Sequence, residues 1–97
     1  MQHLTRESFA PHVGSEFRAR SGEREIVLRL REVKALPTAT GEVRERQPFA
    51  LYFLGPADVL VHQQTVPLEH ESLGSLGIFL VPVGREADGF LYEAVFG

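Results

Sequence analysis

The sequence predicts an all-β fold, a small antiparallel sandwich or barrel of about six or seven strands with a short N-terminal helix. Three observations lead to this prediction. Apolar and polar residues alternate in several short runs, turn residues separate the runs at short intervals, and six apolar residues follow one another at 49–54. Six residues suit a strand and are too few for an independent helix.

The N-terminal helix is the first element in the chain. Thr5 is a suitable N-cap, and Glu7 lies in the first turn, where the helix dipole favours an acid. Pro11 and Gly14 are expected to end the helix within two turns. A helix this short depends on tertiary packing for its stability.

Two alternating segments follow the helix. Residues 16–20 place Phe17 on the inner face, and a turn at Ser21-Gly22 leads into a long strand at 25–36. The alternation of this strand slips by one residue at Glu32. A slip of one residue indicates a β-bulge.

The middle of the chain combines a polar segment with the apolar run. Residues 38–47 are predicted to form an exposed hairpin connection before the strand 49–54, and 59–64 to form a loop with some extended character. A short strand at 65–70 contains Pro67, which places it at an edge or a bulge because proline has no N–H to donate.

The C-terminal third predicts a hairpin between 76–84 and 89–96, turning at Asp88-Gly89. The three most apolar segments, 49–54, 78–83 and 90–96, are expected to adjoin one another. The predicted core is Phe17, Ile26, Leu28, Leu30, Leu51, Phe53, Phe79 and Phe96.

Composition places the chain among ordinary globular proteins and predicts a single domain over residues 1–97, with 43% hydrophobic and 24% charged residues. The absence of cysteine excludes disulfides and thiolate metal sites. No signal peptide and no membrane span are recognised, so synthesis in the cytoplasm is expected, and final assembly outside the cell stays open. Residues 1–46 hold nine basic and seven acidic side chains, whereas residues 47–97 hold one basic and six acidic side chains, so the two halves carry net charges of opposite sign.

No catalytic, metal or cofactor motif stands out, so a non-enzyme is expected. His62, Glu69, His70 and Glu71 match no metal-ligand spacing and are interpreted as surface polar residues. Ser75 lacks the flanking pattern of a nucleophile elbow. A stripe of arginines in 18–31 is interleaved with glutamates, which favours cross-strand ion pairs over nucleic-acid binding.

Several stretches together resemble a known family. They are residues 4–17 with the pattern Leu-Thr-x-Glu-x-Phe, then 48–56, 68–70, 79–84 and 92–96. The chain resembles a family of short bacterial all-β proteins known only as a domain of unknown function. The resemblance implies no functional residues. It implies a role in assembly more than in catalysis, for example in a phage-tail-like or surface assembly.

Two functional hypotheses follow from the apolar strands. Strands 49–54, 76–83 and 90–96 carry apolar residues on both faces, more than a small domain covers. The first hypothesis is a structural or adaptor protein that forms a homo-oligomer, head-to-tail through the opposite charges of its halves, or docks onto other subunits. The alternative is a barrel that binds a small molecule between its sheets near Tyr52 and Tyr92. The expected interface residues are Phe49, Ala50, Tyr52, Leu54, Tyr92, Arg29 and Arg31.

Overall fold

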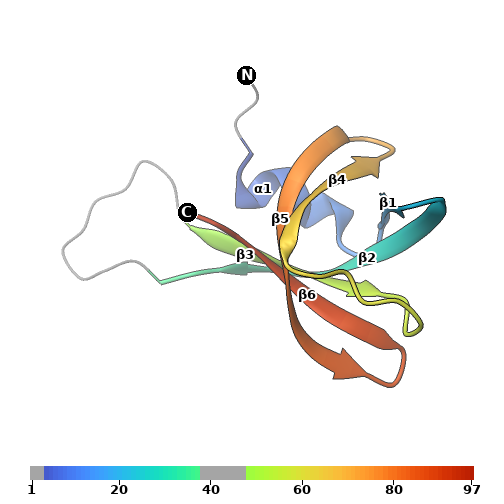
Figure 1. Ribbon diagram of the computed structural model, residues 1–97. Helices are drawn as coiled ribbons and strands as arrows, with labels where there is room; N and C mark the ends of the chain where they lie inside the picture. Colours follow the sequence, from blue (N-terminus) through green and yellow to red (C-terminus); the bar gives the residue numbers. More distant parts are fainter. Residues whose placement is uncertain (1–3, 38–47) are drawn as a thin grey trace.

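A computed structural model describes residues 4–37 and 48–97, and within them the chain forms a closed six-stranded antiparallel barrel with a short N-terminal helix (Figure 1). The predicted all-β class is confirmed. The elements are α1 (Arg6–Phe9), a 3₁₀ turn η1 (Ala10–His12), β1 (Glu16–Ser21), β2 (Arg24–Ala35), β3 (Phe49–Gly55), β4 (Gln64–His70), β5 (Gly74–Glu86) and β6 (Gly89–Phe96).

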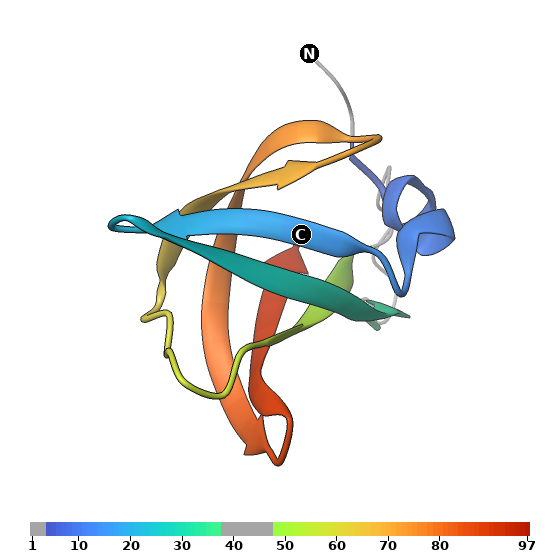
Figure 2. The same cartoon turned by 90° about the vertical axis from the view of Figure 1, so that its right-hand side faces the viewer.

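The strand order around the barrel is β1-β2-β3-β6-β5-β4. Two meanders, β1 to β3 and β4 to β6, are therefore joined at two places. β3 pairs with β6 along its whole length, from Phe49↔Phe96 to Gly55↔Phe90, whereas β1 meets β4 at the single pair Arg18↔Glu69. Figure 2 shows the strands curving around a common centre, with the connection from β3 to β4 crossing one side of the barrel. As expected, the three most apolar segments adjoin, as β3, β6 and β5.

The core consists of the side chains that alternate inward along the strands. Six of the eight predicted core residues are fully buried: Phe17, Ile26, Leu28, Leu30, Leu51 and Phe53. Alternation along β1 and β2 made Phe17, Ile26, Leu28 and Leu30 predictable, whereas Leu51 and Phe53 lie in β3, where both faces are apolar. Tyr92 and Ala94 of β6 complete the inner layer, although Tyr92 was expected at an interface.

The predicted position of Phe79 is wrong. Its side chain is 49% exposed, and its neighbours Ile78 and Leu80 are buried instead. Residues 78–81 are all apolar, so alternation alone cannot decide which face points inward. The pairing with β4 settles which face points inward, because Ile78 lies opposite the buried Val66. Phe96, also predicted for the core, is only partly buried at the barrel end.

Two β-bulges bend the long strands. The predicted slip in β2 is confirmed as a register shift against β3 between Leu30 and Glu32. A second shift, between Pro82 and Gly84 of β5, was not predicted. Bulges increase local twist, and here they allow the two longest strands to curve around the barrel. The predicted C-terminal hairpin is confirmed, and Gly89 has the expected positive φ of 155°.

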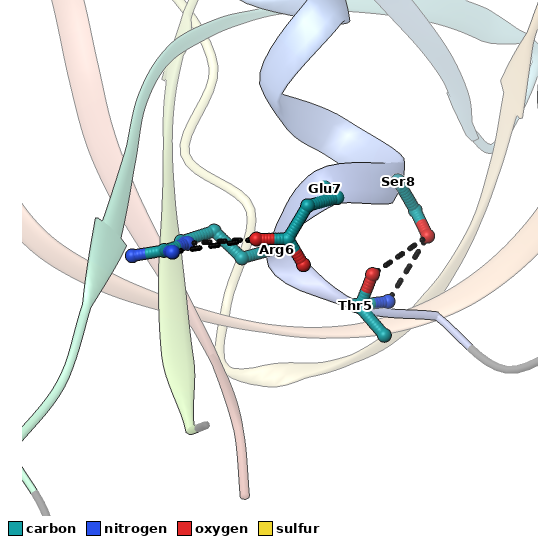
Figure 3. Close-up of polar contacts among 4 residues, drawn as sticks. All are labelled: Thr5, Arg6, Glu7 and Ser8. Atoms are coloured by element: carbon teal, nitrogen blue, oxygen red, sulfur yellow. Dashed lines mark hydrogen bonds and ion pairs between the residues drawn. The ribbon is translucent and has the colours of Figure 1, made fainter. Parts of the chain in front are cut away.

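The N-terminal helix packs against one end of the barrel (Figure 2). Thr5 precedes it as the N-cap residue, and its backbone N–H donates to Ser8 Oγ at 3.0 Å, which stabilises the first turn (Figure 3). Phe9 is fully buried, with its ring centroid 6.0 Å from that of Phe49 and 5.7 Å from that of Phe96. These three rings form an aromatic cluster beneath the helix.

The helix ends within two turns as predicted, because α1 ends at Phe9, the 3₁₀ turn η1 that contains Pro11 ends at His12, and Gly14 follows with a positive φ. Proline is tolerated in η1 because the first residues of a helical turn have no partner for their N–H. The polar segment 38–47, predicted as an exposed hairpin connection, lies outside the described residues.

Candidate functional site

The outer surface of β5 and β6 exposes apolar side chains. Phe79, Val83 and Val95 are 49%, 48% and 58% exposed, respectively. Partly buried apolar residues of β3, β5 and β6 lie beside them, and the register places Leu54 directly opposite Leu91. We call this surface the outer apolar face, and it consists of Leu54, Phe79, Val81, Val83, Leu91 and Val95.

A polar pair lies within this face. Tyr52 and Glu93 are opposite one another on β3 and β6, and the Tyr52 hydroxyl donates to the Glu93 carboxylate at 2.7 Å. This hydrogen bond is the main reason that the pKa of Tyr52 is raised, and burial adds to it. The hydrogen bond gives the Tyr52 hydroxyl proton an acceptor, and the Glu93 carboxylate places an acidic group within the apolar surface.

Charged residues of both signs border the face. Arg31 of β2 forms an ion pair with Glu86 at the end of β5, and Arg29 forms one with Glu16. A surface hollow of about 370 Å³ lies at this border, lined by Arg31, Glu32, Tyr52, Glu86 and Leu91. The border can therefore offer both donors and acceptors to a partner.

Four of the seven interface residues expected from the sequence lie on or beside this surface. Tyr52 and Leu54 are partly buried on the outer side of β3, and Arg29 and Arg31 are exposed on β2. Both arginines already have a carboxylate partner within the chain. They can orient a neighbour, but they are not free cations.

The other three expected interface residues are covered within the chain. Phe49 belongs to the aromatic cluster beneath α1, and Ala50 is also fully buried. Tyr92 is completely buried inside the barrel, where its hydroxyl accepts a hydrogen bond from the Val61 backbone N–H at 2.9 Å. Tyr52 and Tyr92 consequently lie on opposite sides of the barrel wall and do not line one cavity.

Sequence reasoning missed Phe79 and Val83, which are central to the outer apolar face. One available signal was the clean alternation of β4, in which Val66 and Leu68 are buried between polar or exposed neighbours. Pairing β4 with β5 would have fixed the phase of Phe79. No comparable signal marks the bulge that exposes Val83.

A second hollowed region follows the seam between β1 and β4. β1 and β4 pair at Arg18↔Glu69, and the next pair in this register would be Arg20 with Pro67. Pro67 has no N–H to donate, so the hydrogen bonds between the two strands do not continue there. The edge or bulged position predicted for this strand is wrong, because β4 pairs in regular register with β5 and closes the barrel with β1, although by a single pair. Two hollows of about 280 and 290 Å³ open here, and both are lined by Ala19, Arg20 and Pro67.

A buried histidine is the third notable feature. His70 is 6% exposed, which corrects its interpretation as a surface residue. Its Nδ1 accepts hydrogen bonds from the backbone N–H groups of Ser72 (3.0 Å) and Leu73 (3.2 Å), so the ring proton is on Nε2 and is donated to Ser15 Oγ at 2.9 Å. Ser15 in turn donates to the His12 carbonyl.

This serine–histidine contact does not activate a nucleophile. Histidine acts as a base by accepting the hydroxyl proton, whereas Nε2 of His70 donates to Ser15. Its Nδ1 is occupied by backbone donors, with no carboxylate to orient the ring. The arrangement fits a structural role, holding the residues before β1 to the turn after β4.

The remaining candidate residues are dispersed. His62 and Glu69 are exposed on separate segments, and within residues 4–37 and 48–97 no three histidine, aspartate or glutamate side chains converge as metal ligands do. Ser75 is exposed on β5. In the same residues, no helix has the length and hydropathy needed to cross a membrane.

Comparison with known proteins gives one result. No curated protein and no solved structure matches the chain. A family model matches residues 4–96, which include every strand of the barrel and the N-terminal helix. The chain therefore belongs to the family DUF6916, a domain of unknown function.

Proposed function

We propose that this protein is a non-enzymatic structural or adaptor protein that self-associates through its outer apolar face. The supporting observation is the half-exposure of Phe79, Val83 and Val95 on two adjacent strands. Contiguous apolar patches on soluble proteins commonly mark contact sites, because water around apolar atoms is released when a partner covers them.

The strands themselves explain why the apolar residues are outside. The inner layer is already filled by Leu51, Phe53, Tyr92 and other fully buried side chains. The second apolar row of β5 and β6 therefore has no place in the core. A specific contact needs roughly 1,000 Å² of buried surface in total, or about 500 Å² from each partner. The outer apolar face with its charged border is an adequate centre for such a contact.

A second copy of the chain is the occupant that the charges support best. Arg31–Glu86 at the border presents both signs side by side, so in a two-fold contact each sign can face the opposite sign on the second copy. The ion pairs Arg24–Asp58 and Arg31–Glu86 also join the basic first half to the acidic second half within one chain. This internal pairing weakens the case for a strictly head-to-tail contact.

Charge still affects the assembly. Arg18 and Arg20 on β1 are exposed, as are Glu69 and Glu71 around the end of β4. Such groups set register and encounter rate more than affinity, which the apolar centre supplies. A self-complementary contact closes as a dimer, whereas a contact between different patches builds a ring or filament. Either form suits a component of a larger structure, such as a phage-tail-like or surface assembly.

Sedimentation velocity from low to high micromolar concentration tests the proposal. Wild type is expected to shift towards larger species with concentration, and the double variant Phe79→Ser, Val95→Ser is expected to stay monomeric. Val13→Ser is the matched control, because Val13 is 48% exposed but lies beside η1, outside the face. A wild type that is monomeric throughout, in low and high salt alike, contradicts the proposal.

Small-molecule binding is the second candidate, and the hollows at the β1–β4 seam support it. Their volumes of about 280 and 290 Å³ approach the lower end for ligand pockets. In this second candidate function, the ligand site lies at the seam instead of near Tyr52 and Tyr92. Native mass spectrometry distinguishes the candidates, because a retained ligand adds a fixed mass to the monomer, whereas self-association doubles or multiplies the mass.

A further inference from the structure

The segment 4–15, which we call the N-terminal plug, is joined to β2 by backbone hydrogen bonds of Gly14 and Ser15 with Leu30, and its side chains contact the barrel at two further places. Phe9 packs on the aromatic cluster with Phe49 and Phe96. At the other place, Ser15 and His12 contact His70 at the end of β4, where the two imidazole rings meet edge to face with centroids 4.7 Å apart. The second contact is polar and contains titratable groups, unlike the first.

Only one form of His70 satisfies all its partners. Nδ1 must be without a proton to accept from Ser72 and Leu73, and Nε2 must carry one to donate to Ser15. Protonation adds an N–H at Nδ1 that faces two backbone N–H groups. The charged ring therefore loses two acceptor interactions where it stands, and turning away to regain them breaks its bond to Ser15.

We propose that His70 is an acid-sensitive latch that holds the N-terminal plug on the barrel and releases it when the imidazole becomes protonated. The latch joins three segments: the turn after β4, the residues before β1, and η1. Breaking it leaves the residues before Gly14 attached through Phe9 and Leu4, while Gly14 and Ser15 stay hydrogen-bonded to the backbone of Leu30. Release uncovers the rings of Phe49 and Phe96 at that end of the barrel.

The surroundings of His70 set the pH at which the latch responds. Burial is the main reason that its pKa is lowered, and the neighbouring His12 of η1 and Arg18 of β1 lower it further. Glu71, the next residue along the turn, opposes these effects by stabilising the charged ring. Phe17 contributes an apolar ring 4.4 Å from the imidazole.

The direction of the response follows from this lowered pKa. The released state binds the proton more tightly than the latched state, because a solvated histidine has its ordinary pKa of about 6.5. The latch is therefore fully closed above that pH and weakens as the pH falls below it. The ratio of released to latched protein rises by at most about tenfold for each pH unit.

Amide hydrogen exchange read by mass spectrometry tests the latch, after correction for the pH dependence of intrinsic exchange. Between pH 7.5 and 5.0, peptides covering 4–15 are expected to lose protection several-fold in wild type, while β3 peptides keep theirs. In His70→Gln, an amide oxygen and an NH₂ group replace Nδ1 and Nε2 without titrating, so the acid response should disappear. His62→Gln is the matched control, because His62 is exposed in a loop.

Two results would overturn the proposal. One is a wild-type plug whose corrected exchange does not change with pH, and the other is an equal acid response in wild type and His70→Gln. If His70→Gln does not fold, the protonation of the wild-type His70 ring is instead followed by the ¹⁵N chemical shifts of its nitrogens as the pH is lowered. Protonation of Nδ1 must then track the exchange of 4–15, and a plug that opens while Nδ1 stays unprotonated refutes the latch.

Discussion

Replacing Gly89 with alanine should destabilise the barrel more than the same change at any other turn glycine of the β4–β5–β6 meander. Gly89 opens β6, and a Cβ built there lies 1.8 Å from the backbone carbonyl oxygen of Gly55. Backbone atoms cannot turn away as a side chain can. The carbonyl belongs to the last residue of β3, so relief of the clash requires β3 and β6 to separate where Gly55 pairs with Phe90.

The expected magnitude has two parts. A side chain at a φ of 155° costs about 1–3 kcal/mol, because this region is sparsely populated by residues other than glycine. Overpacking adds roughly 1–3 kcal/mol. The total of about 2–6 kcal/mol is a large fraction of the roughly 5–15 kcal/mol that typically separates folded from unfolded domains. The melting temperature should fall by about 10 °C or more.

Two other glycines separate these contributions. Gly74 has a φ of 74° with open space around it, so Gly74→Ala should show only the conformational cost of about 1 kcal/mol. Gly84 has neither a close neighbour nor a positive φ, so Gly84→Ala should be within about 0.5 kcal/mol of wild type. Urea unfolding followed by circular dichroism measures all three. A Gly89→Ala variant no less stable than Gly74→Ala would refute the steric part of the reasoning.

Three further predictions concern stability. Phe53→Ala should lower the unfolding free energy by about 3–5 kcal/mol because Phe53 is fully buried. Phe79→Ala should change the unfolding free energy of the monomer by less than about 1 kcal/mol, because Phe79 is half exposed. Similar losses for the two variants, measured by urea unfolding of dilute protein, would contradict the assignment of Phe53 to the inner face and Phe79 to the outer face. Tyr92→Phe should cost about 1–2 kcal/mol by leaving the Val61 N–H without its acceptor, and an unchanged denaturation midpoint would argue against that bond. The unfolding free energy of wild type should also decrease below pH 6.5, by at most about 1.4 kcal/mol per pH unit from His70, and His70→Gln should remove that part of the slope.

Much of the fold could be predicted from the sequence because β1, β2 and β4 show apolar–polar alternation and clear turn residues separate several strands. In β2, Ile26, Leu28 and Leu30 alternate with charged or exposed residues, and the slip at Glu32 marked the bulge correctly. The turn residues at Asp88-Gly89 located the C-terminal hairpin. Such signals are local, so a single sequence reveals them.

The candidate site was less predictable because it depends on pairing between distant segments. Phe79 could be assigned to a face only after β4 and β5 were aligned, and Tyr92 was expected at the surface although its hydroxyl is satisfied inside by Val61. Ser15 and His70 are 55 residues apart in sequence, and no motif connects them. The barrel closure that brings them together rests on the single β1–β4 pair.

Protection of single cysteines tests the central claim, self-association through the outer apolar face, most directly. The natural chain contains no cysteine, so each variant carries one reactive thiol. Val95→Cys places it at the most exposed residue of the face, and Ala57→Cys places a control thiol on the exposed turn after β3. The rate of maleimide labelling at Val95→Cys should fall with increasing protein concentration, while that at Ala57→Cys stays constant. Equal, concentration-independent rates at both positions would contradict the account.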